Sequence, residues 1–372
     1  MTMTVATLIV LLLVWSSVIR RLGLAERVLI IGTSALAREL VERFAAGGTG
    51  RQRLAGVIDD LDERDVLNAT RLTGPLARLG AIIADLRPDR IVVALTDRRG
   101  RLPMSALLDA RVRGVVVEDG VECYERLTGK IPIESLAPSY LVSSRDFKKS
   151  HVDLAFGHAL SLIVSAAALV ALAPLFAVIA LIIRLDSPGP VLFVQDRIGW
   201  RGRRFRLLKF RTMRPSSEPR SEWARDNEHR VTRVGRWLRK YRLDELPQLI
   251  NVVRGDLNLV GPRPHPVCNF ELFARGIPFY SLRSVVRPGL TGWAQVRQGY
   301  ANGLEEETEK MRYDLYYIKH MSVWLDLRIL SRTFPMLLSG SGSEAPMDAK
   351  AAKRPASAAT SSPSIVRVGI AH

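Results

Sequence analysis

Residues 155–183 read AFGHALSLIVSAAALVALAPLFAVIALII, and this stretch divides the chain into two parts. It contains no Asp, Glu, Lys or Arg. As one straight helix rising about 1.5 Å per residue, it would outreach a hydrocarbon core of about 30 Å. Pro174 lies inside it, where a proline kinks or breaks a helix. The stretch therefore predicts an apolar membrane segment that is interrupted at Pro174.

Basic residues flank this apolar segment at both ends. Arg145, Lys148 and Lys149 precede it, and a strongly basic segment, 184–214, follows it. Because positive residues stay on the cytoplasmic side of a membrane, both ends are expected on that side. A re-entrant hairpin that enters and leaves by the cytoplasmic face fits both flanks, and a tilted spanning helix is the alternative.

The first residues form another apolar segment. No charged residue occurs before Arg20 and Arg21. A signal peptide has its positive charge before the apolar run, and here the order is reversed. We therefore expect residues 1–21 to be a short membrane anchor with its C-terminal end in the cytoplasm. Because the run is at the lower limit for spanning, a peripheral hydrophobic helix is the alternative.

Between the two apolar segments, strand and helix patterns alternate. The expected strands are 27–31, 54–58, 90–94 and 114–117, and the expected helices are 36–44, 75–86 and 103–112. This rhythm predicts a Rossmann-like, doubly wound parallel sheet. The glycine fingerprint begins at Gly32 but has Ser34 and Ala37 at its later glycine positions. A bound dinucleotide is therefore not expected, and the alternative is a regulatory or purely structural domain.

The net charge of +17 indicates anionic partners. Next to a membrane segment, the natural ones are anionic lipid head groups and nucleotide phosphates. No recognition-helix, zinc-finger or RNA-binding motif is present, so nucleic acid is not expected as a partner. Cys123 and Cys268 lie far apart and outside any CxxC motif. This spacing indicates neither a disulfide framework nor a zinc site.

Two adjacent carboxylates, Asp244 and Glu245, come just before Pro247 and an apolar helical run, 249–253. Asp244 is a candidate N-cap of that helix, whose free N–H groups and dipole would favour a bound phosphate. The plainer interpretation is a capping Asp followed by an ordinary acidic residue of the first turn.

Basic residues in rigid contexts surround this pair. Apolar, Gly or Pro neighbours hold Lys209, Arg211, Arg242, Arg263 and Arg287. A carboxylate that attacks phosphorus needs the phosphate charge neutralised, which arginines and a divalent cation can do. One carboxylate of an adjacent pair can hold the metal while the other attacks. The pattern therefore favours phosphate chemistry at Asp244 and Glu245.

Several distinct motifs follow in one order. They are SPGPVLF (187–193), QDRIG (195–199), KFRTM (209–213), RLDELPQLIN (242–251), LVGPRP (259–264), RPGLTGWAQ (287–295) and DLYY (314–317). With them, residues 145–338 closely resemble the bacterial sugar transferase family, the polyprenyl-phosphate glycosyl-1-phosphate transferases that begin exopolysaccharide and O-antigen repeat units. The run YERLTGKIPIESL (124–136) resembles the linker of the larger members. Those members have a Rossmann-like domain and several N-terminal spanning helices, whereas this chain has a single N-terminal apolar segment.

The resemblance implies a membrane-bound polyprenyl-phosphate hexose-1-phosphate transferase. Such an enzyme moves sugar 1-phosphate from a UDP-sugar to undecaprenyl phosphate and releases UMP. Asp244 would be the nucleophile that forms an aspartyl-phosphosugar intermediate, and Glu245 the metal-side carboxylate, with Mg²⁺ or Mn²⁺ held near both. The substrates would be bound by Lys209, Arg211, Arg242, Arg263, Arg287, Gln295 and Asp314. The family's re-entrant helix, broken near a proline, favours the hairpin over the spanning helix and places the membrane break at Pro174.

The expected architecture is α/β throughout. Its parts are a membrane anchor (1–21), a Rossmann-like domain (22–144), a basic hinge with a re-entrant membrane helix (145–186), a mainly helical α/β catalytic domain (187–338) and a disordered tail (339–372). Helices are expected near 305–320 and 321–338, the second resting on the bilayer surface. The catalytic domain is expected on the cytoplasmic face of a bacterial inner membrane. Its partners there are the lipid bilayer, the two substrates and other polysaccharide-assembly proteins.

Two other functions fit parts of the chain. One is a membrane-anchored nucleotide-sensing or assembly protein with a catalytically silent C-terminal half, against which the intact Asp244–Glu245 pair argues. The other is a soluble nucleotide-sugar epimerase or dehydratase. Its nicotinamide fingerprint and Tyr-x-x-x-Lys pair are missing from the first domain. No motif distinguishes which sugar would be moved.

Overall fold

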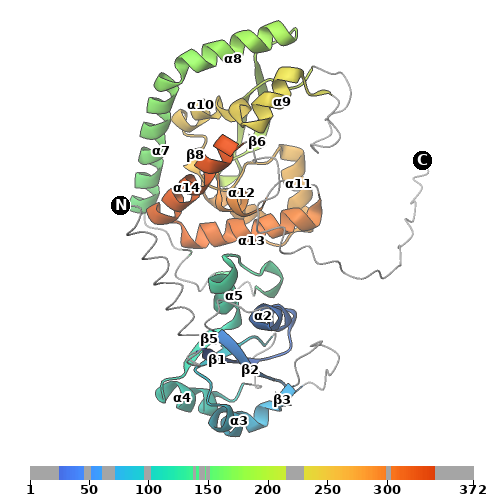
Figure 1. Ribbon diagram of the computed structural model, residues 1–372, viewed down its shortest axis with the longest axis vertical. Helices are drawn as coiled ribbons and strands as arrows, with labels where there is room; N and C mark the ends of the chain where they lie inside the picture. The colour runs from blue at the N-terminus through green and yellow to red at the C-terminus, as the bar shows by residue number, and fades with distance from the viewer. Residues whose placement is uncertain are drawn as a thin grey trace, which may run out of the picture.

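The computed structural model describes residues 25–45, 52–60, 72–95, 102–136, 140–141, 147, 151–214, 230–298 and 303–339 (Figure 1). The predicted N-terminal anchor lies outside the described residues. So do the tail beyond Ser339 and, apart from Phe147, the basic hinge 145–149.

A parallel sheet forms the first part of the structure. Its strands are β1 (Glu26–Ile31), β2 (Gln52–Ile58), β3 (Leu72–Gly74), β4 (Arg90–Val93) and β5 (Val116–Asp119). Their spatial order is β3-β2-β1-β4-β5, and every neighbouring pair is parallel. This order belongs to doubly wound sheets and confirms the predicted parallel sheet. The fourth predicted strand begins at Val116 rather than at Gly114, because Gly114 has φ 92° and turns the chain after the preceding helix.

Helices cover both faces of this sheet (Figure 1). They are α2 (Ala35–Ala45), the 3-10 turn η1 (Leu76–Arg78), α3 (Leu79–Leu86), α4 (Met104–Val112) and α5 (Gly120–Thr128), followed by the 3-10 turn η2 (Ile133–Ser135). Alternate side chains of β1 point to opposite faces, as the pleat requires. Val28 and Ile30 pack with α2 and α5, whereas Leu29 and Ile31 pack with α3 and α4. All four side chains are fully buried.

The loop after β1 is closed by a carboxylate of the same domain. Asp59 Oδ2 accepts hydrogen bonds from the Thr33 backbone N–H at 2.8 Å and from Thr33 Oγ1 at 2.7 Å. Gly32 has φ 114°, and a Cβ there would lie 2.7 Å from the carbonyl oxygen of Ala94. In a dinucleotide-binding sheet, the N–H groups of this loop face a phosphate. Here the Thr33 N–H faces Asp59.

In the chain, two apolar helices come between the sheet domain and the C-terminal region. They are α7 (His151–Ala171) and α8 (Ala173–Asp186), which meet at a bend at Leu172 (Figure 1). Pro174 lies in the first turn of α8, where a missing N–H is tolerated. The apolar stretch is therefore interrupted as two helices, with the bend two residues before Pro174, and the break at Pro174 within a membrane stays a prediction. Among the described residues, Leu154–Ala171 is the one helical segment long and apolar enough to cross a membrane.

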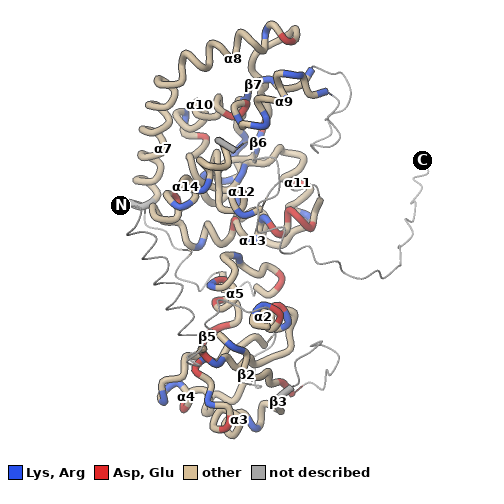
Figure 2. The backbone as a smooth tube through the Cα atoms, viewed as in Figure 1, with Lys and Arg blue, Asp and Glu red and all other residues tan. Residues whose placement is uncertain are grey.

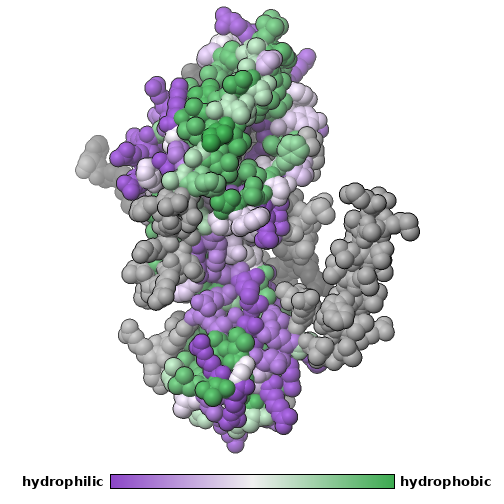
Figure 3. All heavy atoms as spheres, turned by 90° about the vertical axis from the view of Figure 1, so that its left-hand side faces the viewer, coloured by the Kyte–Doolittle hydropathy of each residue, from purple (hydrophilic) through white to green (hydrophobic). Residues whose placement is uncertain are grey.

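Apolar side chains cover the outer faces of α7 and α8 (Figure 3). Val170 is 79% exposed and Leu185 is 78% exposed. The inner face of α7 is held by polar contacts: His158 Nδ1 lies 2.8 Å from Asn258 Oδ1, and Ser161 Oγ accepts a hydrogen bond from the Leu259 N–H at 3.2 Å. One side of α7 thus belongs to the folded C-terminal region, and the other is open.

The C-terminal region is mainly helical and contains two small sheets. The antiparallel hairpin pairs β6 (Leu192–Ile198) with β7 (Arg204–Phe210) across η4 (Trp200–Gly202), and β8 (Asn258–Val260) pairs in parallel with β9 (Gly289–Thr291). The helices are α9 (Arg233–Lys240), α10 (Gln248–Val253), α11 (Val267–Gly276), α12 (Trp293–Arg297), α13 (Leu304–His320) and α14 (Val323–Ser339), with the 3-10 turns η6 (Leu243–Glu245) and η7 (Tyr280–Val285). The helices predicted near 305–320 and 321–338 are confirmed.

Helix α13 joins this region to the sheet domain (Figure 1). Lys319 Nζ lies 2.7 Å and 2.9 Å from the two carboxylate oxygens of Glu125 on α5. Trp293 Nε1 donates to the Gly129 carbonyl at 2.9 Å. One apolar cluster runs from β1 through α5 to α13. Glu307 and Asp314 of α13 pair with Arg283 of the C-terminal region.

Candidate active site

The dyad turn, Arg242–Glu245, joins α9 to α10. Arg242 has φ 54°, a left-handed conformation that residues other than glycine rarely adopt. It ends α9 and starts η6, and the N-cap of α10 is Pro247. The prediction that Asp244 caps α10 is therefore wrong, because the left-handed residue begins a separate turn that ends before the helix starts. Both Asp244 and Glu245 are buried.

Glu245 is held by two cations that come from distant parts of the chain. Its Oε1 lies 2.9 Å from Lys209 Nζ on β7 and 2.7 Å from Arg263 Nη2. Burial alone would raise the pKa of Glu245. The charges of Arg263, Lys209 and Arg242 outweigh burial and hold this pKa well below its usual range. Glu245 is therefore a fixed anion with one oxygen, Oε1, fully engaged.

Asp244 has a different environment, although it is the adjacent residue. No hydrogen bond or ion pair to its carboxylate is found among the described residues. Burial raises its pKa above the usual range, and the charge of Glu245 adds to the rise, while Lys209, Arg239 and Arg263 oppose it. Asp244 is thus a buried carboxyl group with cations nearby. No side chain among the described residues forms a hydrogen bond or ion pair with it. We call Asp244, Glu245, Lys209 and Arg263 the dyad cluster.

The loop that carries Arg263 is fixed by close backbone packing. A Cβ on Gly289 would lie 2.0 Å from the backbone nitrogen of Gly261. The Gly261 N–H donates to the Thr291 carbonyl, and the Gly289 N–H donates to the Pro262 carbonyl, both at 2.9 Å. The glycines of the two Gly/Pro-rich motifs therefore allow β8 and β9 to meet, and this contact sets the direction of Arg263.

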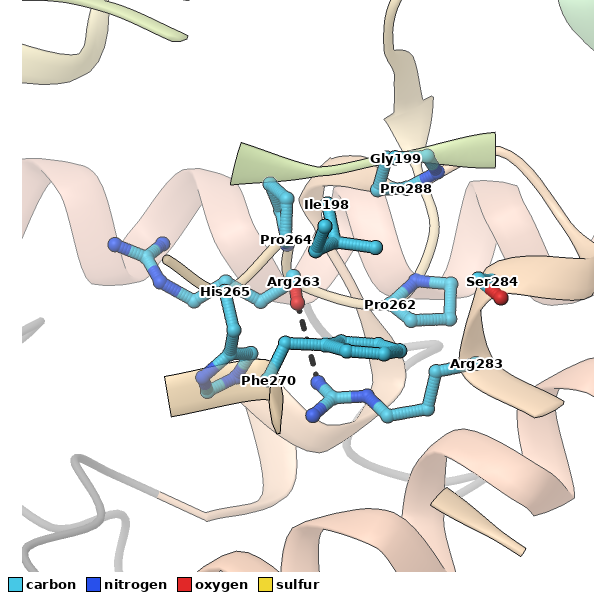
Figure 4. A pocket seen from close by; sticks show the side chains of 10 residues that line it. All are labelled: Ile198, Gly199, Pro262, Arg263, Pro264, His265, Phe270, Arg283, Ser284 and Pro288. Atoms are coloured by element: carbon cyan, nitrogen blue, oxygen red, sulfur yellow. Dashed lines mark hydrogen bonds between the residues drawn. The ribbon is translucent and has the colours of Figure 1, made fainter. Parts of the chain in front are cut away.

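A pocket lies behind this loop (Figure 4). It is lined by Ile198, Gly199, Pro262, Arg263, Pro264, His265, Phe270, Arg283, Ser284 and Pro288. Figure 4 shows the Arg283 guanidinium donating to the backbone carbonyl of Arg263, at 3.1 Å. Arg283 therefore supports the loop from its rear.

Arg283 belongs to a second group of buried charges, the buttress cluster of Tyr280, Arg283, Glu307 and Asp314. Arg283 Nη1 lies 2.6 Å from Glu307 Oε1, and Nη2 lies 2.8 Å from Asp314 Oδ2. Tyr280 Oη donates to Glu307 at 3.0 Å and also contacts Arg283. Burial raises the pKa of Asp314 to about 6, although Arg283 opposes the shift. Each acid in this cluster has a partner.

The predicted substrate-binding residues fall into separate places. Lys209 and Arg263 meet at the dyad, and Arg242 adjoins it. Arg211 is buried at the end of α8, where its guanidinium donates to the carbonyls of Ser187 at 2.6 Å and Pro188 at 3.0 Å. Asp314 lies in the buttress cluster. The structure therefore brings three of the predicted cations to the dyad and gives Arg211 and Asp314 contacts within the protein.

The last two predicted residues flank β9, with Arg287 just before the strand and Gln295 after it on α12. The Arg287 guanidinium stacks on Trp200, 4.4 Å from the ring centre, and burial lowers its pKa. Gln295 Nε2 donates to the Leu290 carbonyl at 3.1 Å, so this side chain ties α12 to β9.

Three basic residues near the dyad were not singled out from the sequence. They are Arg239, whose charge acts on Asp244, Arg283, and Lys310, whose pKa is lowered by burial to about 8. One signal was available on α13. Glu307 and Asp314 share the helix face of the buried Met311 and Leu315, and charges on such a face need a buried partner.

The carboxylates of the dyad can be tested for their fit to a divalent cation. No group of three or more His, Cys, Asp or Glu side chains suited to a metal is found in the described part of the chain. Mg²⁺, however, commonly binds through one or two carboxylates together with substrate phosphates. Only Oε1 of Glu245 takes part in the ion pairs with Lys209 and Arg263. The donor set therefore fits a metal held by Glu245 and Asp244.

Comparison with known proteins assigns the C-terminal half. Residues 152–340 match the family model described as bacterial sugar transferase. A UDP-N-acetylgalactosamine-undecaprenyl-phosphate N-acetylgalactosaminephosphotransferase of Aeromonas hydrophila is 38% identical over 266 residues, which is 71% of this chain and 60% of that protein. The chain thus spans less than two thirds of that relative's length.

Two shorter matches each cover about half of this chain. A UDP-glucose:undecaprenyl-phosphate glucose-1-phosphate transferase of Caulobacter vibrioides is 48% identical over 181 residues, 48% of this chain and 68% of that protein. The exopolysaccharide production protein PSS of Rhizobium leguminosarum is 39% identical over 189 residues, 49% of this chain and 94% of that protein. The second relative consists almost entirely of the region that matches.

Proposed function

The chain belongs to the bacterial sugar transferase family, and on this premise we propose that it transfers a sugar 1-phosphate from a UDP-sugar to undecaprenyl phosphate. UMP is the released product. The lipid-linked sugar would begin a repeat unit of an exopolysaccharide or O-antigen type of polymer. The relatives named above transfer different sugars to the same lipid, so the proposal covers the reaction and leaves the sugar open.

One observation supports this function most directly, namely the contrast within the dyad. Glu245 is held by Lys209 and Arg263, whereas the buried Asp244 carboxyl has no donor among the described residues. A nucleophile needs free lone pairs, and the phosphate it attacks needs nearby cations. Asp244 meets the first condition, and Lys209 and Arg263 meet the second.

The proposed chemistry has two displacement steps at the same phosphorus. In the first, a carboxylate oxygen of Asp244 attacks the β-phosphorus of the UDP-sugar. The bond from this phosphorus to the bridging oxygen breaks, and UMP leaves with the electron pair. In the second, a phosphate oxygen of undecaprenyl phosphate attacks the phosphorus of the aspartyl phosphosugar. The bond to Asp244 breaks, and the free carboxylate is restored.

The cations of the site would neutralise the donor diphosphate. We assign this role to Lys209 and Arg263, with Arg242 and Arg287 at the edges of the site. Arg211, Gln295 and Asp314 would act by holding backbone and loops in place. A Mg²⁺ or Mn²⁺ ion held by Glu245 and Asp244 would add Lewis-acid stabilisation of the phosphate charge when bound.

The membrane geometry supports the same reaction. We propose that α7 and α8 form the re-entrant membrane segment, with its bend near Pro174 inside the bilayer and the C-terminal region on the cytoplasmic face of the inner membrane. The exposed apolar faces of both helices and the polar contacts on the inner face of α7 support this placement. Such a segment would bring Asp244 to the membrane surface, where a lipid phosphate and a soluble nucleotide both have access.

The domain assignment follows from this placement. We propose a membrane anchor (1–21), a Rossmann-like domain (22–144), the hinge and re-entrant helix (145–186), the catalytic domain (187–338) and the tail (339–372). The Rossmann-like domain would hold α13 in place and offer a surface to other polysaccharide-assembly proteins. Its loop after β1, closed by Asp59, supports a structural role over nucleotide binding.

The test is a UMP-release assay on membranes that contain the protein. UMP should appear with at least one of a panel of UDP-sugars, in the presence of Mg²⁺ and undecaprenyl phosphate, and chelation of the metal should stop it. No UMP with any donor would favour the alternative of a silent assembly protein.

A further inference from the structure

A groove lies between α8 and α9, beside the dyad turn. It is lined by Ile179 and Ile182 of α8 and by Arg233, Val234, Trp237 and Leu238 of α9. Its volume is about 440 Å³, within the range of about 300–1,000 Å³ that is typical of small-molecule sites. Arg233 is the one charged residue in a lining that is otherwise apolar. The groove therefore suits a hydrocarbon chain.

The inner wall of the groove is continuous with the dyad turn. Ile179 and Leu238 belong to a buried cluster against which Leu243 and Leu246 pack. These two leucines flank Asp244 and Glu245 in sequence. A chain in the groove would therefore end close to the turn that carries both carboxylates.

A cation, Arg239, adjoins the lining of the groove in sequence. Arg239 directly follows Leu238, its Nε donates to Thr212 Oγ1 at 3.0 Å, and its charge acts on Asp244. No carboxylate in the described part of the chain forms an ion pair with Arg239. Lys209 and Arg263 pair with Glu245, and the proposed function assigns them to the donor diphosphate. Arg239 is thus available for a ligand phosphate near the groove.

We propose that the α8–α9 groove binds the first isoprene units of the polyprenyl phosphate acceptor and that Arg239 receives its phosphate. This inference rests on the proposed transferase function and adds the place of the lipid substrate. The groove offers an apolar channel whose lining residue Leu238 precedes Arg239, and its inner wall packs against Leu243 and Leu246, which flank the proposed nucleophile Asp244 and Glu245. The acyl chain of a bilayer phospholipid would also fit the channel. The function of such a lipid, however, does not require its head group to bind the cation near Asp244.

In the proposed placement, the groove opens on the side of α8 that would face the membrane. Leu181 and Leu185 on the same helix are 60% and 78% exposed, and Lys and Arg gather on α9 (Figure 2). A polyprenyl phosphate could thus enter sideways from the bilayer, with its chain along α8 and its phosphate at the basic helix. The two substrates would then approach Asp244 from different sides.

The experiment uses the double variant Ile182→Ala with Trp237→Ala in the full chain. Both side chains are partly exposed, at 41% and 54%, so their removal leaves no closed cavity. We measure KM for undecaprenyl phosphate and, separately, the burst of UMP released from the UDP-sugar without acceptor. We expect KM to rise about tenfold, equivalent to about 1.4 kcal/mol. The acceptor-free burst should stay within about twofold of the wild-type value.

Geranyl phosphate in detergent provides a second readout, because it contains only the first two isoprene units. The double variant should lose affinity for it by the same factor as for the full-length lipid. Leu181→Ala is the matched control. It removes a similar apolar side chain from α8 outside the groove, and both acceptors should keep their wild-type KM.

Several outcomes would overturn the inference. An unchanged KM in the double variant would mean that the acceptor binds elsewhere. An equal rise in the Leu181→Ala control would assign the effect to general membrane contact, and an effect on undecaprenyl phosphate alone would place bilayer chains in the groove. A changed oligomeric state of the double variant would assign the groove to a contact between copies of the chain. Loss of the burst in the wild-type protein, by contrast, would contradict the proposed function itself.

Discussion

The dyad cluster and the buttress cluster lie next to each other and are built from the same kinds of side chain. Arg283 links them by donating to the Arg263 carbonyl. In the buttress cluster, Glu307 and Asp314 both pair with Arg283. In the dyad cluster Glu245 is paired, and Asp244 is not. Buried charge alone therefore does not distinguish the two clusters, whereas a buried carboxyl group without a donor does, and the proposed nucleophile rests on this difference.

The largest expected effect comes from removing that free carboxyl group. Asp244→Asn should lower UMP release by at least about 10³-fold, because the amide cannot form the phosphosugar intermediate. The midpoint of thermal unfolding should not fall, since the variant removes a buried charge that no donor stabilises. Asp109→Asn, at an exposed position on α4, is the control and should leave turnover unchanged. Turnover retained in Asp244→Asn would remove Asp244 from the role of nucleophile.

Asp244→Asn is expected to affect activity and not stability. Breaking the buttress cluster should instead act mainly on stability. Arg283→Met leaves Glu307 and Asp314 buried without their cation, and this should lower the free energy of unfolding by about 3–5 kcal/mol. Denaturant unfolding of the purified protein measures the loss. The triple variant Arg283→Met, Glu307→Leu and Asp314→Leu carries no unpaired charge, so it should recover much of the stability. A triple variant as unstable as the single one would contradict this account.

Removing a cation from the dyad should act on rate and on pH dependence together. Lys209→Met should lower kcat by about 10²–10³-fold, the usual loss for one electrostatic contact to a developing charge. The positive charge of Lys209 also lowers the pKa of Asp244. Without it this pKa rises further, and Asp244 becomes protonated at a higher pH. The acid limb of the pH–rate profile should therefore move to higher pH.

Lys240→Met is the matched control for this experiment. Lys240 lies on the exposed side of α9 and faces Tyr241 rather than the dyad. Its loss should leave the acid limb in place. If the acid limb of the pH–rate profile is also unchanged in Lys209→Met, Asp244 does not control this profile.

The smallest effect concerns stability as a function of pH. The pKa of Asp314 is about 6 in the folded protein, above a value of about 3.9 for an unfolded Asp. Between these two values the folded state holds a proton that the unfolded state releases, so stability falls as pH rises. Asp314→Asn should reduce this fall by about 1–3 kcal/mol. Unfolding measured at pH 4, 5 and 6 tests it, and equal slopes in both proteins would refute the assignment.

Much of the fold could be predicted because its signals are local. The apolar runs of β1 and β4, the helical spacing of α2 and the uncharged stretch of α7 and α8 each lie within a few turns of chain. Errors arose where backbone conformation decided the outcome. The left-handed Arg242 ended α9 and separated Asp244 from α10. No sequence signal for this conformation exists at an arginine, which adopts it only under tertiary constraint.

The site could be predicted in part. The motifs named Asp244, Glu245, Lys209 and Arg263, which the structure brings together. They also named Arg211 and Asp314, which contact other parts of the protein instead. The sequence did not predict Arg283 or Arg239 as site residues. Arg283 contacts residues far away in sequence, and Arg239 acts on Asp244 across a turn. An arginine's partner cannot be read from its neighbours in the chain.

By itself the sequence determined the parallel sheet, the interrupted apolar segment, the basic character of the chain and the pair of adjacent carboxylates. Those properties follow from side-chain type and short-range spacing. The tertiary structure alone decided which of the two carboxylates is paired. Lys209 and Arg263 come from positions 36 residues before and 18 residues after Glu245. Both reach Glu245 Oε1 because of where β7 and the β8 loop pack, and Asp244 is left without a donor.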